Sequence, residues 1–195
     1  MDWFVGENYS LGRLLVTEGL AAIYLVAFLA ARNQFRPLVG STGMLPIPRF
    51  LRVVPFTRSP SIFHLHYSDR FLEGICWTAA GLSLAALLGL TQVVPLAVCM
   101  LVWFALWVLY LSIVNVSQLW YSFGWESLLL EAGFLAIFLG NASVGPPILV
   151  LLMLRWLLFR LEFGAGLIKM RGDRCWKNLT CLYYHHEPQP MPGPF

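Results

Sequence analysis

The sequence has 195 residues, of which 58% are hydrophobic and only 12% are charged, and its formal net charge is +3. A water-soluble domain carries about a quarter charged residues, so this composition excludes an ordinary soluble domain. The basic residues are scattered, which excludes a nucleic-acid-binding protein because such proteins concentrate Lys and Arg in a patch. Several apolar runs approach the roughly 20 residues needed to cross the hydrocarbon core of a membrane. We therefore expect an all-α, multi-pass transmembrane helical bundle surrounded by membrane lipids.

Five apolar runs predict about five spans within a single membrane domain, 1–195. In chain order they are 14–31, 71–90, 93–114, 126–140 and 147–170. The first follows a single basic residue, Arg13, and contains Glu18, which favours an uncleaved span over a signal peptide. Only Thr91 and Gln92 separate the second from the third, which predicts a tight antiparallel hairpin. The fourth is short for a span, and the fifth begins after a Pro-Pro pair.

The longest connection, 32–70, is rich in Arg and Pro, and long regular structure is not expected there. Its mixture of arginine and bulky apolar residues suits the headgroup layer. The positive-inside rule places this connection in the cytoplasm, together with the basic tail 171–195, and places the amino terminus on the opposite side. Cys175 and Cys181 in the tail have neither CxxC nor zinc-ligand spacing, and a disulfide between them stays an open alternative.

Ionisable side chains inside the last two runs are the main candidates for a site. They are Glu126, Glu131, Arg155, Arg160, Glu162 and Lys169. An Arg, Lys or Asp at the centre of a membrane helix costs roughly 2.5–3.5 kcal/mol on insertion, so we expect these groups to turn inward and pair. The leading pairs are Arg155 or Arg160 with Glu131, and Lys169 with Glu126 or Glu162. Such a network fixes helix register or, alternatively, lines a functional cavity.

Other patterns are weaker. Gly164 and Gly166 are expected to let a neighbouring helix approach closely. The histidines His64 and His66, and the pair in "YHHE" at 184–187, lack a third ligand at metal-site spacing. No Ser–His–Asp or nucleophile-elbow pattern is present in the sequence. We expect no metal, no cofactor and no established catalytic residue.

Two long motifs resemble the lipase maturation factor family. They are "FGWESLLLEAGFLAIFL" (123–139) and "LRWLLFRLEFGAGLIKMRGDRCWKNLTCLYYHHEPQPMPGP" (154–194), and "GMLP" (43–46) and "YLSIVNVSQLWYSF" (110–123) fit as well. The resemblance implies a multi-pass membrane protein that helps exported lipases fold and assemble. It implies the endoplasmic reticulum membrane in a eukaryote and the cytoplasmic membrane in a bacterium. Family members continue well past this motif, so the resemblance also implies a truncated form.

A shorter segment, "GAGLIKMRGDRCW" (164–176), is similar to the segment of vitamin K-dependent carboxylases that contains their catalytic lysine. On that similarity Lys169 takes the position of the base, and an interfacial lysine with a disfavoured ammonium form suits that role. A membrane enzyme using Lys169 is thus one alternative. A small transporter with an intramembrane polar path is another. A non-enzymatic maturation role remains the leading interpretation.

Overall fold

A computed structural model describes residue 6 and residues 9–186, with side chains described up to Tyr183. The described residues form α-helices and short 3-10 helices and contain no β-strand, which confirms the all-α fold class. The chain divides into two compact units, Met1–Leu152 and Met153–Phe195, called the first and the second unit below.

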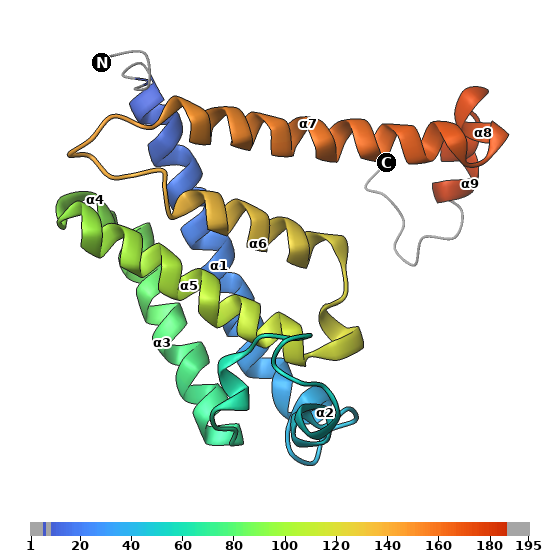
Figure 1. The fold of residues 1–195 in the computed structure, drawn as a ribbon. Helices are drawn as coiled ribbons and strands as arrows, with labels where there is room; N and C mark the ends of the chain where they lie inside the picture. The colour runs from blue at the N-terminus through green and yellow to red at the C-terminus, as the bar shows by residue number, and fades with distance from the viewer. Residues whose placement is uncertain (1–5, 7–8, 187–195) are drawn as a thin grey trace. The chain divides into compact units, whose positions relative to one another are not determined.

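The helices follow one another with short connections (Figure 1). The first unit contains α1 (Ser10–Val39), α2 (Ile47–Val53), η3 (Ile62–His64), α3 (Asp69–Leu87), α4 (Leu90–Val93), α5 (Leu96–Val116), η4 (Gln118–Tyr121) and α6 (Gly124–Ala136). Helix α7 (Ile148–Arg171) begins in the first unit and continues into the second, which also holds α8 (Arg174–Lys177) and α9 (Cys181–His186).

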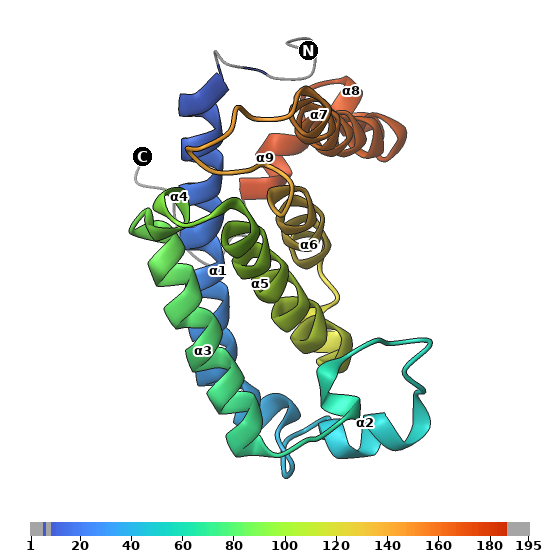
Figure 2. The ribbon, with the colours of Figure 1, turned by 60° about the vertical axis from the view of Figure 1, so that its left-hand side comes forward.

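An aromatic cluster holds the first unit together where α1 and α5 meet. Tyr24 and Phe28 of α1 are fully buried, and Trp103 and Tyr110 of α5 are 1% and 2% exposed. The Tyr110 ring meets the rings of Tyr24 and Phe28 edge-on, at 5.6 Å between centroids in both cases. Edge-to-face pairs of this kind add stability beyond the apolar area that they bury. Helix α3 packs against both α1 and α5, and the three helices lie side by side in both ribbon views (Figure 2).

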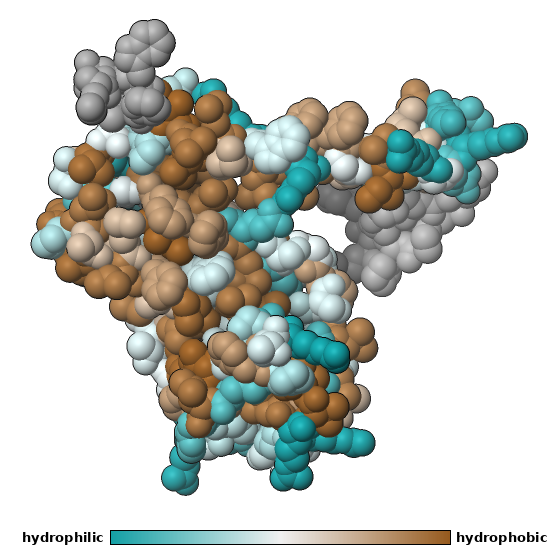
Figure 3. All heavy atoms as spheres, viewed as in Figure 1, coloured by the Kyte–Doolittle hydropathy of each residue, from teal (hydrophilic) through white to brown (hydrophobic). Residues whose placement is uncertain are grey.

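The surface of the first unit suits an apolar environment. Helices α1 and α5 are long and apolar enough to cross a membrane by length and composition. Figure 3 shows hydrophobic side chains over α5 and hydrophilic groups gathered around α2. Helix α6 has only 13 residues, about 20 Å of rise, whereas the hydrocarbon core is about 30 Å thick. The number of membrane crossings stays a prediction.

The connection 32–70 contains more helix than its prolines indicated. Helix α1 continues past residue 31 to Val39, with Pro37 inside it, and α2 follows at Ile47–Val53. Pro37 removes one hydrogen-bond donor, but it lies in the last turn of α1, and the helix ends shortly afterwards when the Gly40 N–H donates to the Phe35 carbonyl at 2.8 Å. Because of this extension, Arg32 and Arg36 lie on α1 and not in a loop.

A single glycine lets α6 approach α1 closely. The Tyr24 hydroxyl donates to the Leu129 carbonyl at 3.4 Å, and a Cβ on Gly133 would overlap that hydroxyl. Within the second unit, a Cβ on Gly164 or Gly166 would meet no described atom within 4 Å. The close approach expected at those two glycines involves a helix outside the second unit and stays a prediction, whereas a close approach is observed at Gly133.

The loop after α6 satisfies its own polar groups. Asn141 is fully buried, its Nδ2 donates to the Val94 carbonyl at 2.6 Å, and its Oδ1 accepts from the Ser143 hydroxyl at 2.6 Å. The buried Arg13 side chain donates to the Val144 carbonyl. Helix α1 and the start of α5 are thus tied to this loop by hydrogen bonds.

Candidate functional site

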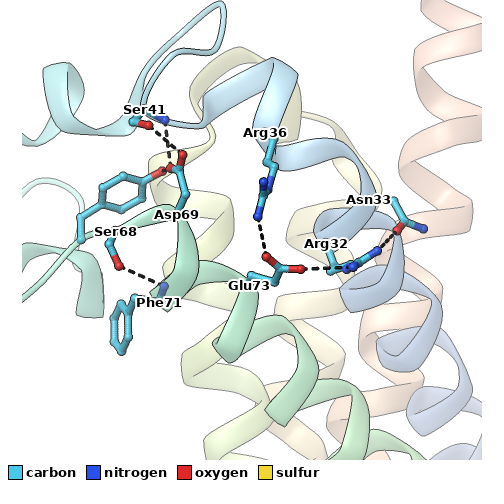
Figure 4. A network of polar contacts seen from close by, with 9 residues as sticks. Arg32, Asn33, Arg36, Ser41, Ser68, Asp69, Phe71 and Glu73 are labelled. Atoms are coloured by element: carbon cyan, nitrogen blue, oxygen red, sulfur yellow. Dashed lines mark hydrogen bonds and ion pairs between the residues drawn. The ribbon is translucent and has the colours of Figure 1, made fainter.

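One polar network joins α1 to α3 at the end of the bundle (Figure 4). Arg32 and Arg36 are four residues apart and project from the same face of α1. Both donate to Glu73 of α3, with nitrogen–oxygen distances of 3.1 Å and 2.7 Å. The sequence did not predict this pairing, because the first span was expected to end at residue 31, before both arginines.

Asp69, the first residue of α3, fastens the loop that follows α1. Its carboxylate accepts from the Ser41 hydroxyl at 2.7 Å, from the Ser41 N–H at 3.0 Å and from the Tyr67 hydroxyl at 2.7 Å. Burial alone would raise the pKa of the Asp69 carboxyl, but the hydrogen bonds from Ser41 and Tyr67 and the charge of Arg36 outweigh it. The pKa of Asp69 therefore lies below its ordinary value of 3.8.

Asp69 should make stability depend on pH in the acidic range. Because its pKa is lowered in the folded state, its contribution is complete above the unfolded value near 3.8 and is lost as the pH falls through the folded pKa. We expect Asp69→Asn to cost about 1 kcal/mol at pH 7. Thermal unfolding in detergent should show the full difference between parent and variant at pH 5 and a smaller difference at pH 3. A difference that stays constant over this range would contradict an ionised Asp69 as the cause.

The first unit also contains a cavity of about 600 Å³ bounded by α1, α5, η4 and α6. A pocket of roughly 300–1,000 Å³ with mostly apolar walls and a few polar groups is typical of a small-molecule site. Most of its lining is aliphatic or aromatic, and the small residues of α1 that border it leave the space open. These small residues are Ala22, Ala27 and Ala30.

Among the described residues that line this cavity, Glu126 is the single charged side chain. It is half-buried in the first turn of α6, and it accepts hydrogen bonds from the Tyr110 hydroxyl and, at 3.0 Å, from Trp125 Nε1. Tyr110 also packs on Tyr24 and Phe28, so the hydroxyl that donates to the carboxylate belongs to a ring fixed in the aromatic cluster. Sequence reasoning named Glu126 but missed Tyr110, because residues on different helices share no periodic signal.

The other predicted site residues lie outside this cavity. Glu131 is exposed on α6 and is absent from the lining. The remaining candidates are exposed on α7, and they are Arg155, Arg160, Glu162 and Lys169. The Lys169 Nζ lies 5.1 Å from the centre of the Trp176 ring, a cation–π distance. The pairs that would join α6 to α7 link the two units and stay predictions, as does the pair of Lys169 with Glu162.

The tail of the second unit contains a disulfide bond between Cys175 and Cys181, with 4.7 Å between the Cα atoms. The spacing of the two cysteines in the sequence had left this disulfide open as an alternative. The exposed Asn178 lies between the two cysteines. Among the described residues, no group of three or more His, Cys, Asp or Glu side chains could hold a metal ion. The side chains of the "YHHE" histidines lie outside the described part of the chain.

Comparison with known proteins gives the family. A family model described as the lipase maturation factor transmembrane domain matches residues 11–195. The chain is 44% identical to Lipase maturation factor 1 of Bos taurus, over 96% of this chain and 36% of the relative. It is 43% identical to the Homo sapiens protein of that name, over 96% and 36% of the two chains. It is 37% identical to Lipase maturation factor 2 of Xenopus tropicalis, over 97% of this chain and 29% of the relative.

No solved structure matches this chain. The chain spans about a third of the length of the curated relatives that it matches. The match nevertheless covers nearly all of its residues, including every helix from α1 to α9. The chain therefore belongs to the lipase maturation factor family.

Proposed function

We propose that this chain is the membrane part of a lipase maturation factor and assists the folding and assembly of exported lipases. The observation that carries the proposal is the 44% identity to Lipase maturation factor 1 over 96% of the chain. The proposal places the chain as a multi-pass protein in the endoplasmic reticulum membrane of a eukaryotic cell. The two long apolar helices, α1 and α5, support a membrane location.

The described side chains suit a scaffold. The buried aromatic cluster of α1 and α5 and the Arg32–Glu73–Arg36 bridge fix the helices against one another. Lys169, the residue in the position of a carboxylase base, is exposed and lies against Trp176.

The test is a chimera in which residues 11–195 of this chain replace the matched region of a full-length Lipase maturation factor 1. In cells that lack the endogenous factor, we expect the chimera to restore at least half of the secreted lipase activity that the parent restores. The measurement is the lipase activity in the medium divided by the amount of secreted lipase protein. A chimera that is inserted and stable but restores no active lipase would contradict the proposal.

Two variants of the chimera separate a scaffold from an enzyme. Lys169→Ala should leave secreted lipase activity unchanged, because the scaffold does not depend on this amine. Gly133→Val should lower it, because the extra methyl groups force α6 away from α1. Loss of activity with Lys169→Ala in a chimera of normal abundance would favour a membrane enzyme instead.

A further inference from the structure

The size of the cavity beside Glu126 limits what can occupy it. Its α1 wall extends from Ala22 to Gln34, a distance of about 18 Å at 1.5 Å per residue. The cavity has about 600 Å³, which lies within the roughly 300–1,000 Å³ typical of small-molecule sites. Its size favours a small ligand with a narrow flexible chain over a helix of another protein.

The rim of the cavity is apolar. Ile23 and Val26 of α1 are 53% and 66% exposed, and Phe123 and Trp125 at the start of α6 are 51% and 63% exposed. In a membrane domain such a rim opens toward lipid, because water would leave these side chains with the full cost of apolar exposure. The narrow chain that suits this cavity is thus an acyl chain.

The chemistry of the cavity selects a headgroup. Five aromatic residues line it together with the Glu126 carboxylate, and they are Tyr110, Trp120, Tyr121, Phe123 and Trp125. Aromatic faces beside a negative charge favour a cation, and recognition of quaternary ammonium groups uses such aromatic surroundings. An anionic headgroup would meet repulsion from Glu126, and the lining residues that the structure describes include no cationic side chain to offset it.

Hydrogen bonding narrows the choice of cation. Each oxygen of Glu126 already accepts one hydrogen bond, from Tyr110 on Oε2 and from Trp125 on Oε1. A primary ammonium brings three donors that must all find acceptors, and most of the lining is aliphatic or aromatic. A trimethylammonium group brings no donor and needs only negative charge and aromatic faces.

We propose that the cavity formed by α1, α5, η4 and α6 binds a choline-headed membrane lipid, with its trimethylammonium group beside Glu126 and one acyl chain along the alanine-rich face of α1. The apolar end at Ala22 and Leu129 receives the chain. Gln34 and Tyr121 add polar side-chain atoms to the lining near the end of α1. This site is independent of the lipase-related role, since its ligand is a component of the bilayer itself.

Quenching of Trp120 tests the site, because Trp120 lines the cavity. The full chain is reconstituted in phosphatidylglycerol vesicles that contain increasing fractions of phosphatidylcholine, phosphatidylethanolamine or phosphatidylglycerol with brominated acyl chains. The fluorescence difference between the parent and Trp120→Phe isolates Trp120 from the other tryptophans. We expect half-maximal quenching by the choline lipid at a mole fraction at least fivefold lower than for the other two lipids.

Two variants with a matched control test the role of the cavity. Glu126→Gln keeps the shape of the side chain and removes its charge, and it should reduce the choline preference to less than twofold. Ala30→Phe should fill the cavity and remove the preference. Glu18→Gln, which neutralises a carboxylate of α1 outside the lining, should leave the preference at its parent value. Circular dichroism verifies that each variant has the helix content of the parent.

Four results would overturn the proposal. The first is equal quenching of Trp120 by all three lipids, which would indicate ordinary bulk lipid contact. The second is a preference for the ethanolamine or the glycerol lipid. The third is a choline preference that survives Glu126→Gln in a normally folded protein. Absence of Trp120 quenching by any lipid would also overturn it and would indicate another occupant of the cavity.

Discussion

Replacing Trp103 with alanine is expected to lower the free energy of unfolding by about 3–5 kcal/mol, the range observed for large-to-small substitutions of buried aromatic residues. Trp103 is 1% exposed, and its ring centroid lies 6.3 Å from that of Tyr24. The substitution removes an indole between α1 and α5, and the surrounding helices cannot collapse into the space without losing the contacts of Tyr110. The measurement is denaturant unfolding of the detergent-solubilised protein, followed by circular dichroism.

The matched control for this substitution is another tryptophan. Trp156 on α7 is 58% exposed, so Trp156→Ala should cost much less than Trp103→Ala. Equal losses for the two variants would mean that the detergent micelle, and not the aromatic cluster, determines the stability of the first unit. A loss confined to Trp103→Ala would show that the cluster between α1 and α5 is the core.

Adding side-chain atoms at Gly133 is the second change with a large expected effect. A Cβ there would overlap the Tyr24 hydroxyl, so Gly133→Val must move α6 or displace the Tyr24 ring from the cluster. Overpacking of this kind costs about 1–3 kcal/mol, and we expect the upper part of that range because Tyr24 is fully buried. The same denaturant titration measures it.

Gly81 provides the control for the glycine substitution. A Cβ on Gly81 of α3 would meet no described atom within 4 Å. Since glycine in a helix interior is less favourable than alanine by roughly 0.8–1 kcal/mol, Gly81→Ala should leave stability unchanged or raise it. A Gly133→Val variant as stable as the parent would show that α6 does not need its close approach to α1.

The parts of the fold that were predicted correctly depend on local patterns. Apolar runs with few charges indicated helices at 14–31 and 93–114, and the structure contains α1 and α5 there. The Pro-Pro pair before the fifth run also indicated the break before α7. These features depend only on residues close together in sequence. Apolar composition favours a membrane helix there, and the missing N–H of proline interrupts one.

The candidate site could be predicted only in part, because it depends on side chains that are distant in sequence. Glu126 was identified as an ionisable group in an apolar run, but its contact with Tyr110 requires α5 and α6 to be packed together. Arg32 and Arg36 were assigned to a loop, because Pro37 argued against the helix that carries them. Proline near the end of a helix is tolerated, and sequence alone does not locate that end.

The loop that contains Asn141 has a consequence for the chain around α6. Non-helical backbone is tolerated at membrane depth only where its polar groups are satisfied by protein or water. The Asn141 amide supplies this, since it bonds to the Val94 carbonyl and to Ser143. These bonds allow this part of the chain to lie against hydrocarbon without leaving the Asn141 amide or the Val94 carbonyl unpaired.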